Sequence, residues 1–254
     1  MLAKSLTKQD KPTFRWSMAL LLPIWVVVGF GLAQIILAIV LYGLKALGVP
    51  FAAVNESVFN TVVGASVYLL SMLLVVGVPW WAKKRSTTRS DIGLTRLPSW
   101  LDIGMAPAGF VVYLILSVIL VSIATAIVPS IDMNQVQDTG FKSIYYGYEY
   151  ILAFTMLIIV APVAEEVLFR GYLYGKLRKS VPVWAAIGIV SVLFGSIHGQ
   201  WNVAIDVFAL SIVLCVLREI TGSIWAGILL HMVKNGLAFY ILFINPAVLG
   251  TIGG

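Results

Sequence analysis

Three polar motifs stand inside otherwise apolar stretches of this 254-residue chain, and they contain both of its histidines. They read Glu165-Glu166-x-x-x-Arg170, Phe194-x-x-x-His198 and His231-x-x-x-Asn235. A charged side chain in the middle of a bilayer costs about 2.5–3.5 kcal/mol on insertion scales. Polar groups at such positions are therefore paired, hydrated by a cavity or functional. Residues of these types can transfer protons as general acids or bases, and they can stabilise an oxyanion by hydrogen bonding.

The first motif predicts an ion pair and a second carboxylate outside it. Glu166 and Arg170 are four residues apart, so on a helix they share one face in the acid-first order that favours pairing. Glu165 then points about 100° away from this pair, because successive helical residues are rotated by that angle. Glu165 is thus the first candidate for a catalytic carboxylate acting as a general base.

The two histidine motifs suggest partners for this carboxylate. His231 and Asn235 share one helical face, where an imidazole and a carboxamide can hydrogen-bond an oxyanion or the imidazole can bind a metal. His198 follows Phe194 on one face, and Phe194 either walls the site against lipid or packs. At about 1.5 Å per residue, Glu165, His198 and His231 all fall at middle depth. A lone His or Asn in a span often only joins helices, but several converging in depth indicate one site.

The composition places the chain in a membrane. Hydrophobic residues make up 60% of it and charged residues 11%, with a mean hydropathy of +0.99, more than a water-soluble core can bury. Because a spanning helix needs about 20 mostly apolar residues, the sequence predicts an all-α polytopic membrane bundle of about seven transmembrane helices. The expected spans are 17–44, 58–82, 103–128, 148–175, 183–201, 203–217 and 222–245. Asp206 and Lys234 are expected to pair with each other or to reach toward the headgroups.

Lys and Arg residues cluster in alternate connections, which predicts the orientation. They gather at the N-terminus and in the second and fourth connections, at Lys4, Lys8, Lys11, Arg15, Lys83, Lys84, Arg85, Arg89, Arg96, Lys176, Arg178 and Lys179. Since translocated loops are depleted in these residues, we expect an integral protein of a bacterial plasma membrane with a cytoplasmic N-terminus. The net charge of +6 then reflects topology and contact with the lipid bilayer, and no nucleic acid partner is expected.

The chain is expected to form one membrane domain. Residues 1–16 are predicted to be a cytoplasmic polar arm, 17–245 a single transmembrane domain and 246–254 a short C-terminal tail. Cys215 is the single cysteine and lies in a predicted span. Its apolar surroundings favour packing over nucleophilic chemistry.

The three motifs, in this order on successive spans, resemble the CAAX protease and bacteriocin-processing family, also called the CPBP or Abi family. The resemblance covers a core at about residues 150–240. It implies an all-helical intramembrane endopeptidase, similar to CAAX prenyl protease 2, with a cavity that opens toward the cytoplasm. Carried over, the resemblance implies a water activated by Glu165 and His198, an oxyanion held by His231 and Asn235, and supporting roles for Glu166, Arg170 and Phe194.

The resemblance leaves the dependence on a metal open. Members of the family are also described as metalloproteases, and a divalent metal such as zinc would have Glu165, His198 and His231 as its candidate ligands. No His-Glu-x-x-His motif is present in the sequence to support a metal site. Glutamate-dependent and metal-dependent hydrolysis are therefore both retained as predictions.

The expected substrate is a peptide or protein segment in or at the membrane. Prenylated CAAX proteins are one class, and secreted peptides or bacteriocins are another. Two further functions would use the same polar groups. One is a noncatalytic scaffold or bacteriocin-immunity protein that binds a partner through the cavity. The other is a proton-coupled transporter, for which buried Glu and His side chains are equally suited.

Overall fold

The computed structural model describes residues 14–82, 87–133, 135, 139–141 and 144–246. Most of the predicted arm 1–16 and of the predicted tail 246–254 lies outside this part of the chain. The described residues contain helices and no β-strand, so the all-α prediction is confirmed. The α-helices are α1 (Met18–Ala46), α2 (Glu56–Met72), α3 (Val78–Ala82), α4 (Trp100–Ile127), α5 (Gly147–Phe154), α6 (Ala161–Glu165), α7 (Tyr174–Leu177), α8 (Val183–Ser196), α9 (Trp201–Thr221) and α10 (Trp225–Phe239).

A helical stretch coincides with each predicted span. Among the described residues, five stretches are long and apolar enough to cross a membrane, and α8 is a shorter apolar helix. Segments of π-helix join α2 to α3 at Leu73–Gly77 and extend α10 at Tyr240–Ile244, and others make Gly147–Leu177 one continuous stretch. Many large apolar side chains of α1 and α4 are exposed, as expected for surfaces that face lipid. The chain is therefore an integral membrane protein.

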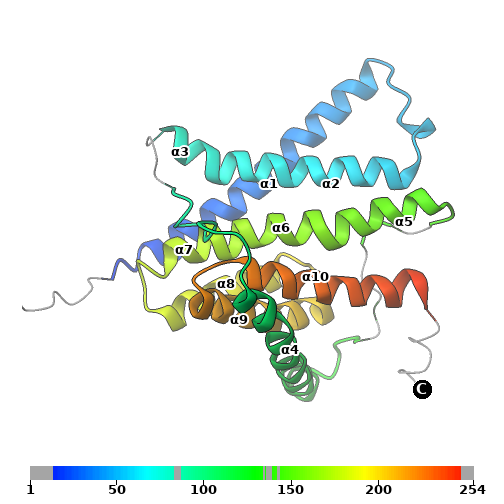
Figure 1. Ribbon diagram of the computed structural model, residues 1–254. Helices are drawn as coiled ribbons and strands as arrows, with labels where there is room; N and C mark the ends of the chain where they lie inside the picture. The colour runs from blue at the N-terminus through cyan, green and yellow to red at the C-terminus, as the bar shows by residue number, and fades with distance from the viewer. Residues whose placement is uncertain (1–13, 83–86, 134, 136–138, 142–143, 247–254) are drawn as a thin grey trace, which may run out of the picture.

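The helices that carry the motifs pack around α9. This helix lies against α8 and α4, while α10 lies against α4, α9 and the π-helical residues Thr155–Val160. In Figure 1, the stretch from α5 to α7 runs between α2 and α10, and α1 crosses α2 at an angle. All three motifs are thus carried by segments that meet inside the bundle.

Side-chain caps define where two of the long helices begin. The Asn55 side chain accepts hydrogen bonds from the backbone amides of Ser57 and Val58 at the start of α2. Ser99 and Asp102 form a capping box at the start of α4. Each cap satisfies amide groups that have no partner within the helix. Helix α4 consequently begins at Trp100, three residues before the predicted span 103–128.

The predicted span 183–201 is too long, and His198 does not lie on a helix. Helix α8 ends at Ser196, and His198 stands in the turn that leads to α9 at Trp201. The His198 Nδ1 atom lies 2.7 Å from the Phe194 carbonyl oxygen, in the last turn of α8. Gly199 follows with a φ of +71°. A side chain bonded to the last carbonyls and a glycine in the left-handed region are both features that end helices.

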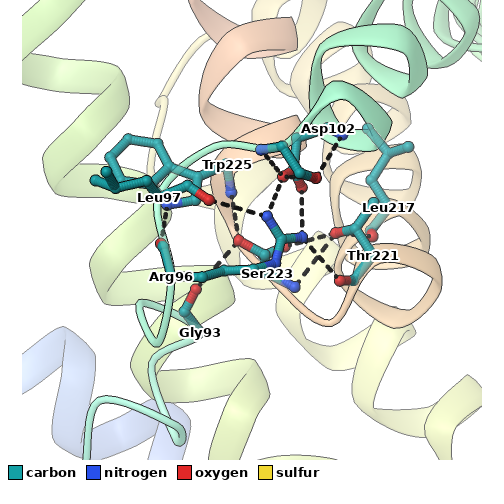
Figure 2. Close-up of polar contacts among 9 residues, drawn as sticks. Gly93, Arg96, Leu97, Asp102, Leu217, Thr221, Ser223 and Trp225 are labelled. Atoms are coloured by element: carbon teal, nitrogen blue, oxygen red, sulfur yellow. Dashed lines mark hydrogen bonds and ion pairs between the residues drawn. The ribbon is translucent and has the colours of Figure 1, made fainter.

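The connection before α4 covers one end of the bundle. The backbone of this connection packs closely against two glycines of the α5–α7 stretch. A Cβ atom at Gly171 would lie 3.0 Å from the Ile92 carbonyl oxygen, and a Cβ atom at Gly175 would overlap the Asp91 carbonyl oxygen. Figure 2 shows Arg96 reaching to Asp102 and to the Thr221 carbonyl. We call residues 87–99 the covering segment.

An ion pair at the surface fastens the covering segment to the residues after α7. Lys179 pairs with Asp91, and the Thr88 amide donates to the same carboxylate at 2.8 Å. Partial burial opposes ionisation, but the hydrogen bonds from Lys179 and Thr88 outweigh it and lower the pKa of Asp91 to about 2. The carboxylate is therefore charged at neutral pH, and this contact persists until the solution becomes strongly acidic.

We predict that Gly175→Ala destabilises the protein by about 1–3 kcal/mol, because the new methyl group overlaps the Asp91 carbonyl and displaces the covering segment. The matched control is Gly43→Ala in α1, where a Cβ meets nothing within 4 Å. Thermal unfolding in detergent micelles measures both variants. Equal unfolding temperatures for the two would contradict the close approach at Gly175.

Candidate active site

Glu165 is held by a tyrosine that the sequence did not single out. The Tyr68 hydroxyl of α2 donates a hydrogen bond to Glu165 Oε1, and His231 Nε2 of α10 lies 3.7 Å from the other oxygen, Oε2. The Glu165 carboxylate thus has partners on two neighbouring helices, whereas its position beside the Glu166–Arg170 pair suggested none nearby. Its side chain remains 14% exposed, so one oxygen is oriented while the carboxylate still reaches open space.

Glu166 is the buried hub of the site. The ion pair expected from the spacing is present, with Arg170 Nη1 2.9 Å from Glu166 Oε1 and both side chains fully buried. The same oxygen lies 3.1 Å from His231 Nδ1. A Cβ at Gly227 of α10 would come within 2.9 Å of Glu166 Oε2, so this glycine provides the room for the carboxylate. The Glu166 carboxylate therefore holds both Arg170, in its own helical stretch, and His231, on α10.

Phe194 packs among the charged and imidazole groups. Its ring lies edge-on to the rings of His198 and His231, with centroids 5.0 and 6.1 Å away. The Arg170 guanidinium carbon lies 4.2 Å from the Phe194 ring centroid, a cation–π geometry. Phe194 is fully buried. Phe194 lies between the two imidazoles and covers the ion pair. It is therefore a packed side chain inside the bundle and does not form a wall against lipid.

The neighbours of His198 identify its accepting nitrogen. Because a carbonyl oxygen only accepts hydrogen bonds, the Nδ1 atom beside the Phe194 carbonyl must carry the proton. The Nε2 atom of neutral His198 then has a free lone pair. His198 also lies within electrostatic reach of Glu165, Lys234 and His231. It is consequently a suitable hydrogen-bond acceptor for a water molecule in the site.

Asn235 has a structural partner as well as a place in the site. The Ala161 amide donates to the Met156 carbonyl in a π-helical pattern, so the next amide would donate to the Leu157 carbonyl. That next residue is Pro162, which has no N–H. The Asn235 side-chain amide donates to the Leu157 oxygen instead, at 2.9 Å. Its NH₂ group retains a second hydrogen for another acceptor.

The four predicted catalytic residues line one cavity of about 220 Å³. Glu165, His198, His231 and Asn235 come from the α5–α7 stretch, the α8–α9 turn and α10. The remaining wall is mostly apolar or aromatic and includes Tyr68, Leu157, Val207, Ala238, Phe239, Leu242 and Phe243. An acid, two imidazoles and a carboxamide therefore share one small space inside the bundle.

Lys234 also lines this cavity, and its partner is the one expected. Lys234 Nζ lies 3.4 Å from Asp206 Oδ2. Tyr113 and Ser117 of α4 donate to the other Asp206 oxygen at 2.6 and 2.7 Å. The predicted pairing of Asp206 with Lys234 is present, and the two hydroxyl groups of α4 bind the remaining Asp206 oxygen. These contacts hold a positive charge at the cavity wall.

The residues present do not form a zinc site. In the part of the chain that the structure describes, no group of three His, Cys, Asp or Glu side chains is placed to hold a metal ion. His198 and His231 use Nδ1 for contacts with a backbone carbonyl and with Glu166, which leaves the Nε2 atom of each ring for another partner. Glu165, His198 and His231 line one cavity, but they are not placed to share a metal ion.

Two groups at the site escaped prediction from the sequence. Tyr68 lies near the middle of the second span, and a tyrosine far from the membrane interface needs a partner for its hydroxyl, which is a usable signal. Gly227 carries no such signal, because its value depends on a carboxylate from another helix. Taken together, the fold and the site define a helical membrane protein with a buried acid–imidazole centre.

Comparison with known proteins agrees with this class. Residues 147–237 match the family model described as Type II CAAX prenyl endopeptidase Rce1-like. A protein of Bacillus subtilis (strain 168) named Putative membrane peptidase YdiL is 31% identical over 77 residues, which are 30% of this chain and 32% of that relative. The chain thus matches about a third of the relative's length. No solved structure matches the chain. Residues 147–237 are thus similar to the core of a CAAX-type membrane endopeptidase, and the family resemblance drawn from the three motifs is confirmed.

We predict that Arg170→Met destabilises the protein by about 3–5 kcal/mol, because it leaves the Glu166 carboxylate charged and buried without its partner. The double variant Glu166→Gln/Arg170→Met is expected to lose less. Arg178→Met is the matched control, since its pair with Glu219 is partly exposed and is worth about 1 kcal/mol or less. Unfolding in detergent micelles is the measurement, and equal losses for Arg170→Met and Arg178→Met would refute the buried hub.

Proposed function

We propose that this protein is a membrane endopeptidase that hydrolyses a peptide bond with a water molecule activated by Glu165 and His198. One observation carries the proposal: Glu165, His198, His231 and Asn235 line the same cavity inside the bundle. The match of residues 147–237 to the CAAX endopeptidase model supports it independently. The substrate would be a peptide or protein segment presented in or at the membrane.

The carboxylate and the first imidazole would bind the attacking water. Tyr68 holds Glu165 Oε1, so Oε2, which lies 3.7 Å from His231 Nε2, would take a proton from the water. The lone pair on His198 Nε2 accepts the second hydrogen of that water and orients it. The water oxygen then adds to the substrate carbonyl carbon, and its proton moves to Glu165.

The second imidazole and the amide would stabilise the charge that forms. When the water adds, negative charge develops on the former carbonyl oxygen, and fixed donors around it lower the barrier. His231 directs Nδ1–H to Glu166, so its Nε2 would donate to the oxyanion when both ring nitrogens carry a proton. The second hydrogen of the Asn235 amide is the other donor. Glu165 finally returns its proton to the amine as the carbon–nitrogen bond breaks.

We predict that Glu165→Gln lowers the rate of peptide cleavage by about 10²–10⁴-fold, because the amide cannot accept the proton of the attacking water. Glu56→Gln is the matched control, since Glu56 is exposed at the start of α2. Purified proteins are incubated with a synthetic panel of apolar peptides, some with a prenylated cysteine, and products are identified by mass spectrometry.

A folded Glu165→Gln protein that cleaves at the wild-type rate would overturn the assignment of Glu165 as the base. Wild-type protein that cleaves none of the panel, yet moves a peptide across liposome membranes along an imposed proton gradient, would favour transport instead.

We further predict that Tyr68→Phe slows cleavage about 10- to 100-fold without abolishing it. The change removes one hydrogen bond to a carboxylate, which is worth about 1.5–3 kcal/mol, while the ring still packs. Steady-state kinetics with a cleaved peptide measures the effect, and a rate identical to wild type would show that Tyr68 has no part in catalysis.

A further inference from the structure

Lys234 is a charged side chain in the cavity wall that the proposed hydrolysis does not use. The catalytic carboxylate and His198 bind the water, and His231 and Asn235 bind the oxyanion. The Lys234 side chain is 14% exposed, and most of the wall around it is apolar or aromatic. A cation in such surroundings is costly unless a partner or a ligand compensates its charge.

Asp206 is the partner of Lys234, and this contact occupies the lysine only in part. Lys234 Nζ lies 3.4 Å from Asp206 Oδ2, farther than the about 2.7–2.9 Å of a charge-assisted hydrogen bond. Tyr113 and Ser117 donate to the other Asp206 oxygen at 2.6 and 2.7 Å. Because an ammonium group has three donors, Lys234 retains donors for a second anion, while α4 holds Asp206 in place.

Helix α10 places Lys234 beside both oxyanion donors. Lys234 lies three residues after His231 and directly before Asn235, and all three side chains line the cavity. Residues three apart on a helix have Cβ atoms about 5–6 Å apart. An extended peptide advances about 3.3 Å per residue. An anion of the substrate that reaches Lys234 therefore belongs to a residue within about two positions of the scissile bond.

We propose that Lys234 binds a carboxylate of the substrate close to the scissile bond, so that the site selects peptides with an acidic group at that place. This inference rests on the proposed endopeptidase function and specifies its substrate. The carboxylate comes either from an Asp or Glu side chain or from the C-terminus of a peptide that is cut within two residues of its end. Lys234 pairs with this group while the apolar wall contacts the neighbouring side chains.

The Asp206 contact makes it possible to remove the lysine without leaving a charge unpaired. Lys234→Met alone would leave the Asp206 carboxylate without its cation and would destabilise the fold for that reason. The double variant Asp206→Asn/Lys234→Met removes both charges, and the asparagine oxygen can still accept from Tyr113 and Ser117. Asp206→Asn is the matched control, because it changes the partner and keeps the lysine.

A panel of synthetic apolar peptides tests the inference. One Glu or one Gln occupies each position in turn, and every peptide is made with a free and with an amidated C-terminus. Mass spectrometry gives the cleaved bond and the value of kcat/KM for each peptide. We expect wild type to favour Glu over Gln within about two positions of the cut by about 10- to 100-fold, as for one hydrogen bond between charged groups.

The variants should separate substrate binding from a purely structural role of the lysine. The preference for the carboxylate is expected to remain in Asp206→Asn and to fall to a ratio of about one in the double variant, as one charged contact is lost. If the C-terminus is the source, amidation removes the preference and the exchange of Glu for Gln does not. Equal cleavage of all matched peptides by wild type, or a preference that persists in the double variant, would overturn the inference.

Peptide binding distinguishes this failure from failure of the proposed function. Fluorescence anisotropy with labelled peptides measures binding to Glu165→Gln protein, with and without the double substitution, in the absence of turnover. A binding preference for the carboxylate that requires Lys234, in a protein whose wild type cleaves nothing, would support the anion contact and contradict the endopeptidase. Cleavage that depends on Glu165, without any preference in binding or rate, would contradict the anion contact and support the endopeptidase.

Discussion

A single buried carboxylate organises the polar centre of this protein. Glu166 contacts Arg170 on its own helix and His231 on α10 through the same oxygen atom. In surroundings of low dielectric constant an unpaired charge is very costly, so each of these groups depends on the others being present. Phe194 completes the arrangement by packing against Arg170 and both imidazoles. The position of His231, and through it that of the cavity, follows from this pairing.

A second constraint comes from the backbone beside the site. Pro162 deprives the Leu157 carbonyl of its helical donor, and Asn235 supplies a side-chain donor in its place. The bond joins α10 to the α5–α7 stretch about two helical turns before Glu165. An irregular helix is thus stabilised by a residue that also faces the cavity. This double role explains how a helix interruption can persist beside the site at little cost in unsatisfied hydrogen bonds.

The distribution of glycines and charges makes the bundle asymmetric along its length. Gly171 and Gly175 admit the backbone of the covering segment, and basic residues surround that end.

The sequence alone determined the helical membrane architecture, the approximate spans and the residues of the polar centre, because apolar length and unpaired charges in lipid allow few alternatives. The spacing of Glu166 and Arg170 also specified their pairing. Only the tertiary structure decided that His198 stands in a turn, that Tyr68 holds Glu165 and that Asn235 bonds to Leu157. These contacts join residues far apart in the chain. They depend on how the helices approach and rotate against one another, which periodicity within a single span does not encode.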